Sequence, residues 1–182
     1  MSTLRVDNLN ARTGTKITVP TGTTLYAPGH VVQVVQNTLT TSVTTTSTSF
    51  ANTGLVASIT PIYANSKILV TTNMSIRSAQ TGNYAGGGIR LVRNLTGSDT
   101  TIVDSVADGS GPYSFWTQAG GASSVNILQM HTINYLDSPG TTSSLTYRTQ
   151  GRLYSSSVTY IYFNPSDNNT GTATIVLMEI AQ

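Results

Sequence analysis

The sequence predicts an all-β protein, a jelly-roll-like β-sandwich that carries an extended N-terminal β arm. Apolar residues alternate with polar ones in many short segments, and Gly-, Asn-, Asp- and Pro-rich turn signals separate these segments. No segment shows the i, i+3, i+4, i+7 apolar spacing of an amphipathic helix. The 182 residues suffice for one domain of ordinary size and a short appendage.

The composition points to a protein that packs against copies of itself. Only 9% of the residues are charged and the formal net charge is +2, so the chain lacks the basic footprint that nucleic acid or an anionic membrane would require. The hydroxyl groups of 32 Thr and 21 Ser replace charged groups in keeping the surface hydrated. Thr is also β-branched, which favours strands. A disordered linker would not carry 38% hydrophobic residues along its whole length. This pattern favours a secreted or virion protein.

Targeting features favour a virion. The chain has no cysteine, so neither disulfides nor thiolate metal sites are expected. Its N-terminus lacks the apolar region of a signal peptide, and no apolar run approaches the ~20 residues that span a bilayer. We therefore expect synthesis in a host cytoplasm without export or membrane insertion. Assembly into a virus particle explains why such a protein has the composition of one that ends up outside the cell.

A short repeat marks the predicted arm, residues 1–30, which precedes the sandwich domain, residues 31–182. The segment TGTKITVP (13–20) is followed directly by TGTTLYAP (21–28). Two such units cannot bury their apolar faces alone. They form either a hairpin on the main domain or a stem in which three chains supply the missing neighbours. The residues expected to anchor or trimerise the arm are Leu4, Val6, Leu9, Ile17, Val19, Leu25 and Tyr26.

Eleven strands are expected in the main domain. Alternation is clearest between Ile68 and Ile76 and again after Val125, whereas Tyr147 and the run from Tyr160 to Phe163 supply aromatic side chains for a core or a subunit contact. Short strands separated by turns at this spacing are typical of a sandwich, of which the jelly roll is the favoured version. The expected strands are 31–36, 39–47, 55–60, 67–75, 89–93, 100–106, 113–117, 124–135, 143–153, 156–163 and 172–180.

Catalytic and metal-binding patterns are weak. The two histidines, His30 and His131, are interpreted as packed or interfacial residues, because nucleophilic catalysis needs a base and an orienting group beside the nucleophile. Among the seven carboxylates, Asp108, Asp137 and Asp167 are assigned to turns, where Asp caps local N–H groups. A loop Ca²⁺ site remains an alternative, although the spacing typical of a calcium loop is missing. We expect no enzyme and no cofactor.

Recognition residues are expected in two loops, 80–88 and 108–121. The glycine-rich run from Tyr84 to Ile89 has neither dinucleotide nor P-loop spacing and is interpreted as a flexible loop that enters a strand. Tyr113, Phe115 and Trp116 form an aromatic cluster of the kind that binds carbohydrate or protein. The only Trp of a β domain, however, belongs to the core more often than to a recognition surface. The candidate recognition residues are thus Tyr84, Tyr113, Phe115 and Trp116.

Several segments together resemble small virion structural proteins of marine and cyanobacterial phages. These are STLRVDNLN (2–10), ITVPTGT (17–23) and YAPGHVVQ (26–33) at the start, and ITPIYANSKILV (59–70) with ATIVLMEI (173–180) in the domain. The resemblance covers about a third of the chain directly. It implies a homotrimer whose N-terminal segment anchors to the particle while the jelly roll projects outward.

The expected function is therefore that of a trimeric tail-fibre-like or attachment protein. Its partners would be its own copies, other capsid or tail proteins, and a host-surface glycan or protein. One alternative is a capsid decoration (cement) protein that stabilises the head, and a more distant one is a carbohydrate-processing enzyme, which would need paired acids.

Overall fold

A computed structural model shows the fold of the chain. It describes residues 21, 27–80, 84–105, 114–118, 125–155, 158–165 and 171–182. Among them, the all-β prediction is confirmed, with eleven strands and no helix. The expectations for Leu4 to Tyr26 of the arm, and for Asp108, Tyr113 and Asp167, lie outside the described residues.

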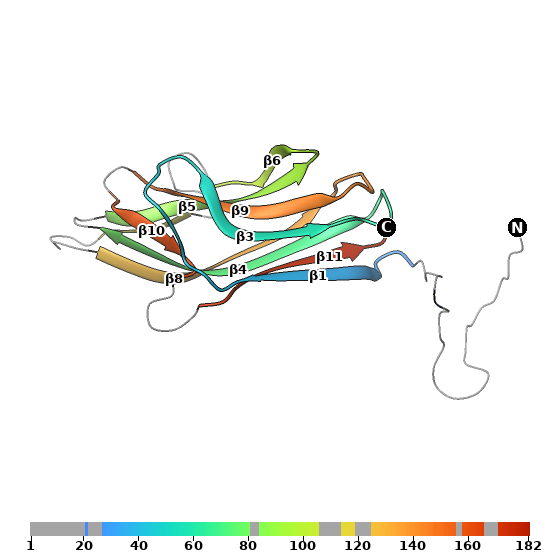
Figure 1. The fold of residues 1–182 in the computed structure, drawn as a ribbon, viewed down its shortest axis with the longest axis horizontal. Coiled ribbons are helices and arrows are strands. Elements are labelled where there is room, and N and C mark those ends of the chain that lie inside the picture. Colours follow the sequence, from blue (N-terminus) through green and yellow to red (C-terminus); the bar gives the residue numbers. More distant parts are fainter. Residues whose placement is uncertain are drawn as a thin grey trace, which may run out of the picture.

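The strands form two antiparallel sheets that pack as a β-sandwich (Figure 1). Sheet A contains β1 (Val31–Leu39), β2 (Val43–Thr45), β4 (Lys67–Gln80), β8 (Val125–Asp137), β10 (Tyr160–Phe163) and β11 (Ala173–Ile180). Sheet B contains β3 (Ala51–Ile59), β5 (Tyr84–Leu95), β6 (Ser98–Val103), β7 (Ser114–Gln118) and β9 (Leu145–Leu153).

Strand β4 is the centre of sheet A. One of its edges pairs with β8 without interruption, from Ile68 opposite Asp137 to Gln80 opposite Val125. Its other edge pairs first with β11 and then with β10. Strand β1 pairs with β11, and β2 pairs with β10. The order β8-β4-β11-β1 therefore runs across one half of the sheet.

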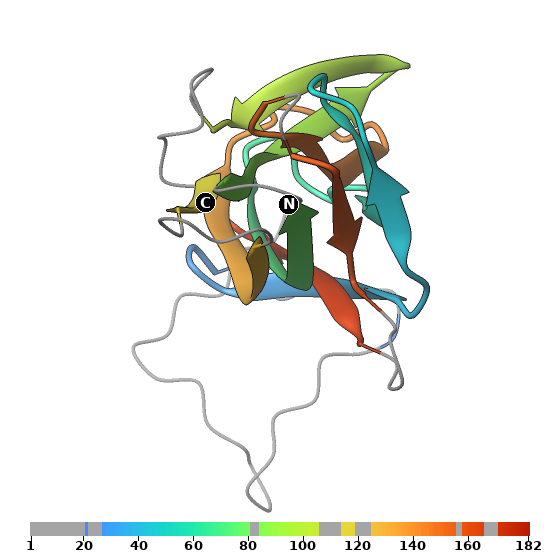
Figure 2. The same ribbon diagram turned by 90° about the vertical axis from the view of Figure 1, so that its left-hand side faces the viewer.

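Strand β5 has the same role in sheet B. One edge pairs with β9, which in turn pairs with β3. The other edge is divided, because its first residues pair with β7 and its last with β6. Strands β7 and β8 thus border the same side of the sandwich, and β1 and β3 border the other, an arrangement that is visible from the end of the molecule (Figure 2).

Alternating side chains build the core. The predicted alternation in β4 is confirmed, since Ile68, Val70, Met74 and Ile76 are all buried. Tyr147 of β9, for which the sequence left a core position and a subunit contact open, lies in the core. The main cluster also includes Leu55, Ile59, Ile89, Leu91, Ile133, Leu145, Leu153, Ile161, Phe163, Ile175 and Leu177.

The glycine-rich run is a strand, and its interpretation as a flexible loop is wrong. Gly86, Gly87 and Gly88 belong to β5 and pair with β7, and the last two also pair with β9. A Cβ atom on Gly87 would lie 2.4 Å from the carbonyl oxygen of Arg152. Glycine is present here because the neighbouring strand approaches too closely for a side chain.

Side-chain amides close the β1/β3 side of the sandwich. Asn37 donates from Nδ2 to the carbonyl oxygen of Val56 at 2.7 Å, and Gln33 donates from Nε2 to that of Thr60 at 2.8 Å. Just before β1, the backbone N–H of Gly29 donates to Ala181 O at 2.7 Å, and Ala181 N–H donates to His30 O at 3.0 Å. Backbone hydrogen bonds therefore join the two ends of the described domain, and side-chain hydrogen bonds join β1 to the segment of β3.

Candidate functional site

Strand β8 forms the edge of sheet A that lies on the side away from β1. It is 13 residues long and, among the described residues, it pairs only with β4. An antiparallel strand paired on one side directs half of its backbone N–H and C=O groups outward. Proteins normally protect such edges with Lys, Pro or a bulge. From Val125 to Leu136 the strand has no Lys or Pro, and its register with β4 has no shift.

Large aliphatic side chains are exposed along β8. Leu128 is 67% exposed, Met130 60% and Leu136 45%. All three occupy even-numbered positions, so they lie on one face of the strand, the outer face of sheet A. The alternation predicted after Val125 is real, but the Leu128–Met130 side of it faces outward.

The apolar surface continues from β8 across the sheet. Leu136 of β8 is opposite Leu69 of β4, Leu69 is opposite Met178 of β11, and Met178 is opposite Val34 of β1. Directly opposed residues lie on the same face. Leu69 and Met178 are half-buried, and Val34 is 56% exposed. These four residues form an apolar row across four strands.

Strand β7 brings two predicted recognition residues next to β8. Phe115 and Trp116 are in a strand, not a loop, and they lie on opposite faces. Phe115 is 4% exposed and contacts the ring of His131 edge-on at 6.2 Å, so its assignment as a recognition residue is wrong. Trp116 is 51% exposed on the outer face of sheet B. Tyr84 begins β5 instead of lying in a loop, and its role in recognition stays a prediction, as does that of Trp116.

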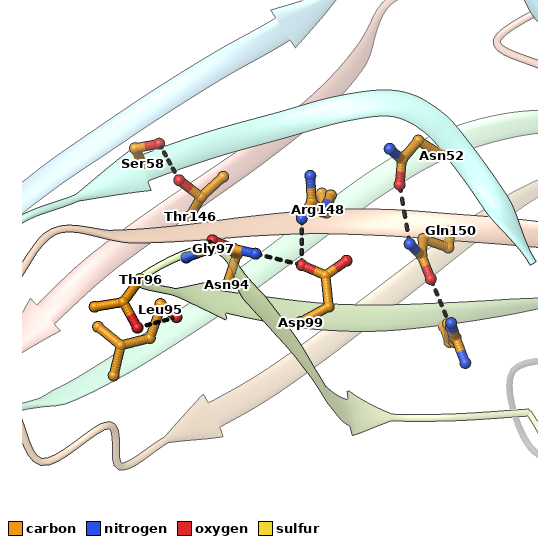
Figure 3. A network of polar contacts seen from close by, with 11 residues as sticks. Asn52, Ser58, Asn94, Leu95, Thr96, Gly97, Asp99, Thr146, Arg148 and Gln150 are labelled. Carbon is orange, nitrogen blue, oxygen red and sulfur yellow. Dashed lines mark hydrogen bonds and ion pairs between the residues drawn. The ribbon is translucent and has the colours of Figure 1, made fainter.

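The outer face of sheet B is polar (Figure 3). Gln150 donates from Nε2 to Asn52 Oδ1 at 3.0 Å and accepts from Arg90 Nε at 2.7 Å. Asp99 pairs with Arg148 and also accepts from Asn94 Nδ2 at 2.6 Å. These hydrogen bonds from Asn94 and Arg148 lower the pKa of Asp99. The first of these two groups joins β3, β9 and β5, and the second joins β5, β6 and β9.

A pocket of about 140 Å³ lies beside these groups, where the pairing of β3 with β9 shifts between Asn52 and Val56. Its volume is below the roughly 300 Å³ at which ligand pockets begin. The Asn52 amide oxygen and the Arg148 guanidinium on its wall already bind neighbouring side chains. The apolar face of sheet A is therefore the better candidate. The pocket is lined by Asn52, Gly54, Leu55, Val56, Arg148 and Thr149.

Asp137 is a buried ion-pair residue, so its assignment to a turn is wrong. It is the last residue of β8 and is 6% exposed. Its carboxylate accepts from Arg93 Nη1 at 2.7 and 2.9 Å and from the Tyr147 hydroxyl at 2.7 Å. Burial and the adjacent carboxylate raise the pKa of Tyr147. The group connects β8 of sheet A to β5 and β9 of sheet B.

Glu179 of β11 is a second buried carboxylate. It accepts from Gln33 Nε2 at 2.6 Å and from the backbone N–H groups of Ile62 and Tyr63 at 2.9 and 3.1 Å. Burial acts to raise its pKa, but these hydrogen bonds to the charged form outweigh burial and the pKa is lowered. Glu179 thereby holds the 60–66 turn against β1 and β11.

Replacing Glu179 with Gln should reduce stability at neutral pH and flatten its acid dependence. Because the pKa is lower in the folded state, the carboxylate stabilises the fold above its unfolded pKa of about 4.3, and this contribution is lost as pH falls through the folded pKa. We expect a loss of about 2 kcal/mol at pH 7 and a smaller difference at pH 3. Urea unfolding at both pH values measures this. Parallel losses at the two pH values would contradict it, and Asp99→Asn at an exposed carboxylate is the control.

The described residues contain neither a cluster of metal ligands nor a membrane-spanning helix. These residues bring together no group of three His, Cys, Asp or Glu side chains that could hold a metal ion. None of them forms a helix of the length and hydropathy needed to cross a bilayer.

Comparison with known proteins finds no family model that matches the chain and no curated protein similar to it.

Proposed function

We propose that this protein is a structural component of a bacteriophage particle and works as a homotrimer. The observation that carries the proposal is the contrast between the two outer faces. Sheet B presents two hydrogen-bonded polar groups, whereas sheet A presents Leu128, Met130 and Leu136 at 45–67% exposure on a strand that pairs only with β4 among the described residues. Large aliphatic side chains this exposed on one strand edge mark a surface that another protein covers.

A structural role is further supported by how three of the four described carboxylates are used. Asp99, Asp137 and Glu179 are each bound by the chain's own donors, namely guanidinium groups, amides and a tyrosine hydroxyl. They stabilise contacts between strands. This use of acidic groups fits a protein whose task is to keep its shape within an assembly.

Within this proposal the sandwich is a jelly-roll-like domain. The first and last strands, β1 and β11, pair side by side in sheet A, and the chain passes repeatedly from one sheet to the other. The resemblance of residues 2–33, 59–70 and 173–180 to small phage virion proteins supports the same assignment. In it, residues 1–30 dock on the particle and the domain projects from the tail as a fibre-like or attachment protein.

The trimer is tested by light scattering on the purified full-length chain. We expect a mass close to three times the chain mass of 19.2 kDa. The described hydrophobic face should hold the trimer together at micromolar concentration and at high salt, because apolar contacts are not screened by ions. A monomer at micromolar concentration would contradict the proposal.

The position on the virion is tested by electron microscopy of gold-labelled protein on intact particles. Label at the tail is the expected result. Label spread over the head would contradict the attachment role and assign the protein to capsid decoration.

A further inference from the structure

The most exposed apolar side chains of the described surface lie on one strand edge. Leu128 and Met130 are the two most exposed of the large hydrophobic residues, at 67% and 60%. They lie at the edge of sheet A, whereas Leu69 and Met178 farther inside the sheet are half-buried. Apolar exposure on this face is thus highest at its two edges, at Val34 of β1 (56%) and along β8, and the two highest values belong to β8. A partner that buries Leu128 and Met130 has to contact β8.

The charge distribution indicates that this partner is another copy of the same chain. Residues 125–136 contain no Asp, Glu, Lys or Arg. A strand that meets its own copies must avoid charge, because like charges brought together repel. A partner with a charged surface would instead be matched by opposite charges on β8, which this strand does not have. On the same outer face, Arg77 of β4 is opposite Leu128, but its guanidinium lies 4.6 Å from the centre of the Tyr162 ring of β10, on the side of β4 away from β8. Copies of β8 can therefore meet without bringing like charges together.

The size of the face agrees with a stable contact between copies. Thirteen residues at about 3.3 Å each make β8 roughly 40 Å long, and the strands β8, β4, β11 and β1 at about 4.8 Å spacing span roughly 15 Å. The outer face over these strands measures roughly 600 Å², a value that includes polar side chains such as Thr132 and Asn134 and approaches the ~800 Å² that each partner buries in a standard interface.

We propose that three copies meet along β8, with the three-fold axis running beside this strand. The inference rests on the proposed trimer and assigns its interface. Residues of one face of a strand are spaced about 6.6 Å apart, which is one layer of side chains. On a three-fold axis each layer contains the same residue from every copy. Leu128, Met130 and Leu136 then form triangular apolar layers, and the polar face of sheet B points away from the axis.

The absence of native cysteine allows a direct test with single-cysteine variants of the full chain. In Met130→Cys, the three thiols should lie close enough to form a disulfide between two copies on oxidation, since such bonds require Cα atoms within about 7 Å. A trifunctional maleimide should convert the protein to a covalent trimer. The matched control is Ile62→Cys, because Ile62 is 51% exposed but lies in the 60–66 turn, which is bound to Glu179 of β11 and not to β8. It should remain monomeric on a denaturing gel.

A second variant tests the contact energetically. Met130→Lys places three positive charges around the axis and should reduce the mass in solution from trimer to monomer. The strand signal in circular dichroism should persist, because Met130 is exposed within the single chain. Ile62→Lys should remain trimeric.

The possible outcomes test the proposed interface along β8 independently of the proposed trimer. If the unmodified protein is a trimer but the Met130→Cys variant does not cross-link and Met130→Lys stays trimeric, another segment or another virion protein covers β8, and this inference is overturned while the trimer stands. If the unmodified protein is a monomer, the proposed trimer is overturned as well.

Discussion

Gly87→Ala should lower the free energy of unfolding by about 3 kcal/mol, at the upper end of what overpacking costs. The added methyl group would lie 2.4 Å from the carbonyl oxygen of Arg152 and 2.4 Å from Cδ1 of Ile161. The first of these atoms belongs to the backbone of β9, which is fixed by pairing with β5 and β3. It cannot withdraw without breaking hydrogen bonds of sheet B, so the strain remains in the folded state.

Thermal unfolding followed by circular dichroism measures this effect. For a chain of this size, 3 kcal/mol corresponds to a decrease in Tm of roughly 6–12 °C. The control is Gly140→Asn, because a Cβ at Gly140 meets no atom within 4 Å and its φ of 67° is one that Asn accepts. It should cost less than about 1 kcal/mol. Equal losses in the two variants would show that Gly87 is not tightly packed.

The glycines of β5 show where sequence reasoning fails. Consecutive glycines are typical of loops, and this pattern alone predicts a loop from Gly86 to Gly88. Their real role depends on strands far away in the chain, since Gly87 is opposite both Phe115 and Leu153. A local pattern does not contain the distance between β5 and its neighbours. Only the completed sheet shows that a side chain has no room there.

Strand positions were predictable because their signal is local. Each of the eleven expected segments overlaps one of the eleven observed strands, and the alternation from Ile68 to Ile76 identifies the buried face of β4 correctly. The alternating pattern has a period of two and needs no knowledge of the partner strand. Boundaries were less accurate. The expected segment 39–47, for example, contains the end of β1 and the separate short strand β2.

The sequence did not allow us to predict which side chains of β7 point into the core. Phe115 and Trp116 are adjacent aromatic residues, and the sequence offers no reason why one rather than the other points inward. The structure decides through the register with β5, which places Phe115 opposite Gly87, where the missing side chain makes room for its ring. The exposed apolar side chains of β8 were not predictable for a similar reason. Apolar residues occur on both faces of this strand, and the sequence does not show which face packs against sheet B.

Asp137→Ala should destabilise the protein by about 4 kcal/mol, which would be the largest effect among these variants. The substitution removes the acceptor for the Arg93 guanidinium, whose side chain is 19% exposed, and for the hydroxyl of fully buried Tyr147. A partly buried cation and a buried hydroxyl then lose their partner at the same time. Urea unfolding at neutral pH measures the loss, and the slope against denaturant should be unchanged because the fold is the same.

Two controls separate the charge from the hydrogen bond. Tyr147→Phe removes only the hydroxyl and leaves the ion pair intact, so it should cost about 1 kcal/mol. Asp99→Ala breaks the exposed pair with Arg148 and should cost less than about 1 kcal/mol.

The double variant Asp137→Leu/Arg93→Met distinguishes the two explanations of a large loss. If the cost of Asp137→Ala arises because the Arg93 charge is left unpaired in a poorly solvated position, removing both charges should restore much of the stability, since apolar side chains of similar volume can replace a buried ion pair. If the double variant is as unstable as Asp137→Ala, the charge is not the cause. The stabilisation would then come from the way the carboxylate holds the end of β8 against sheet B.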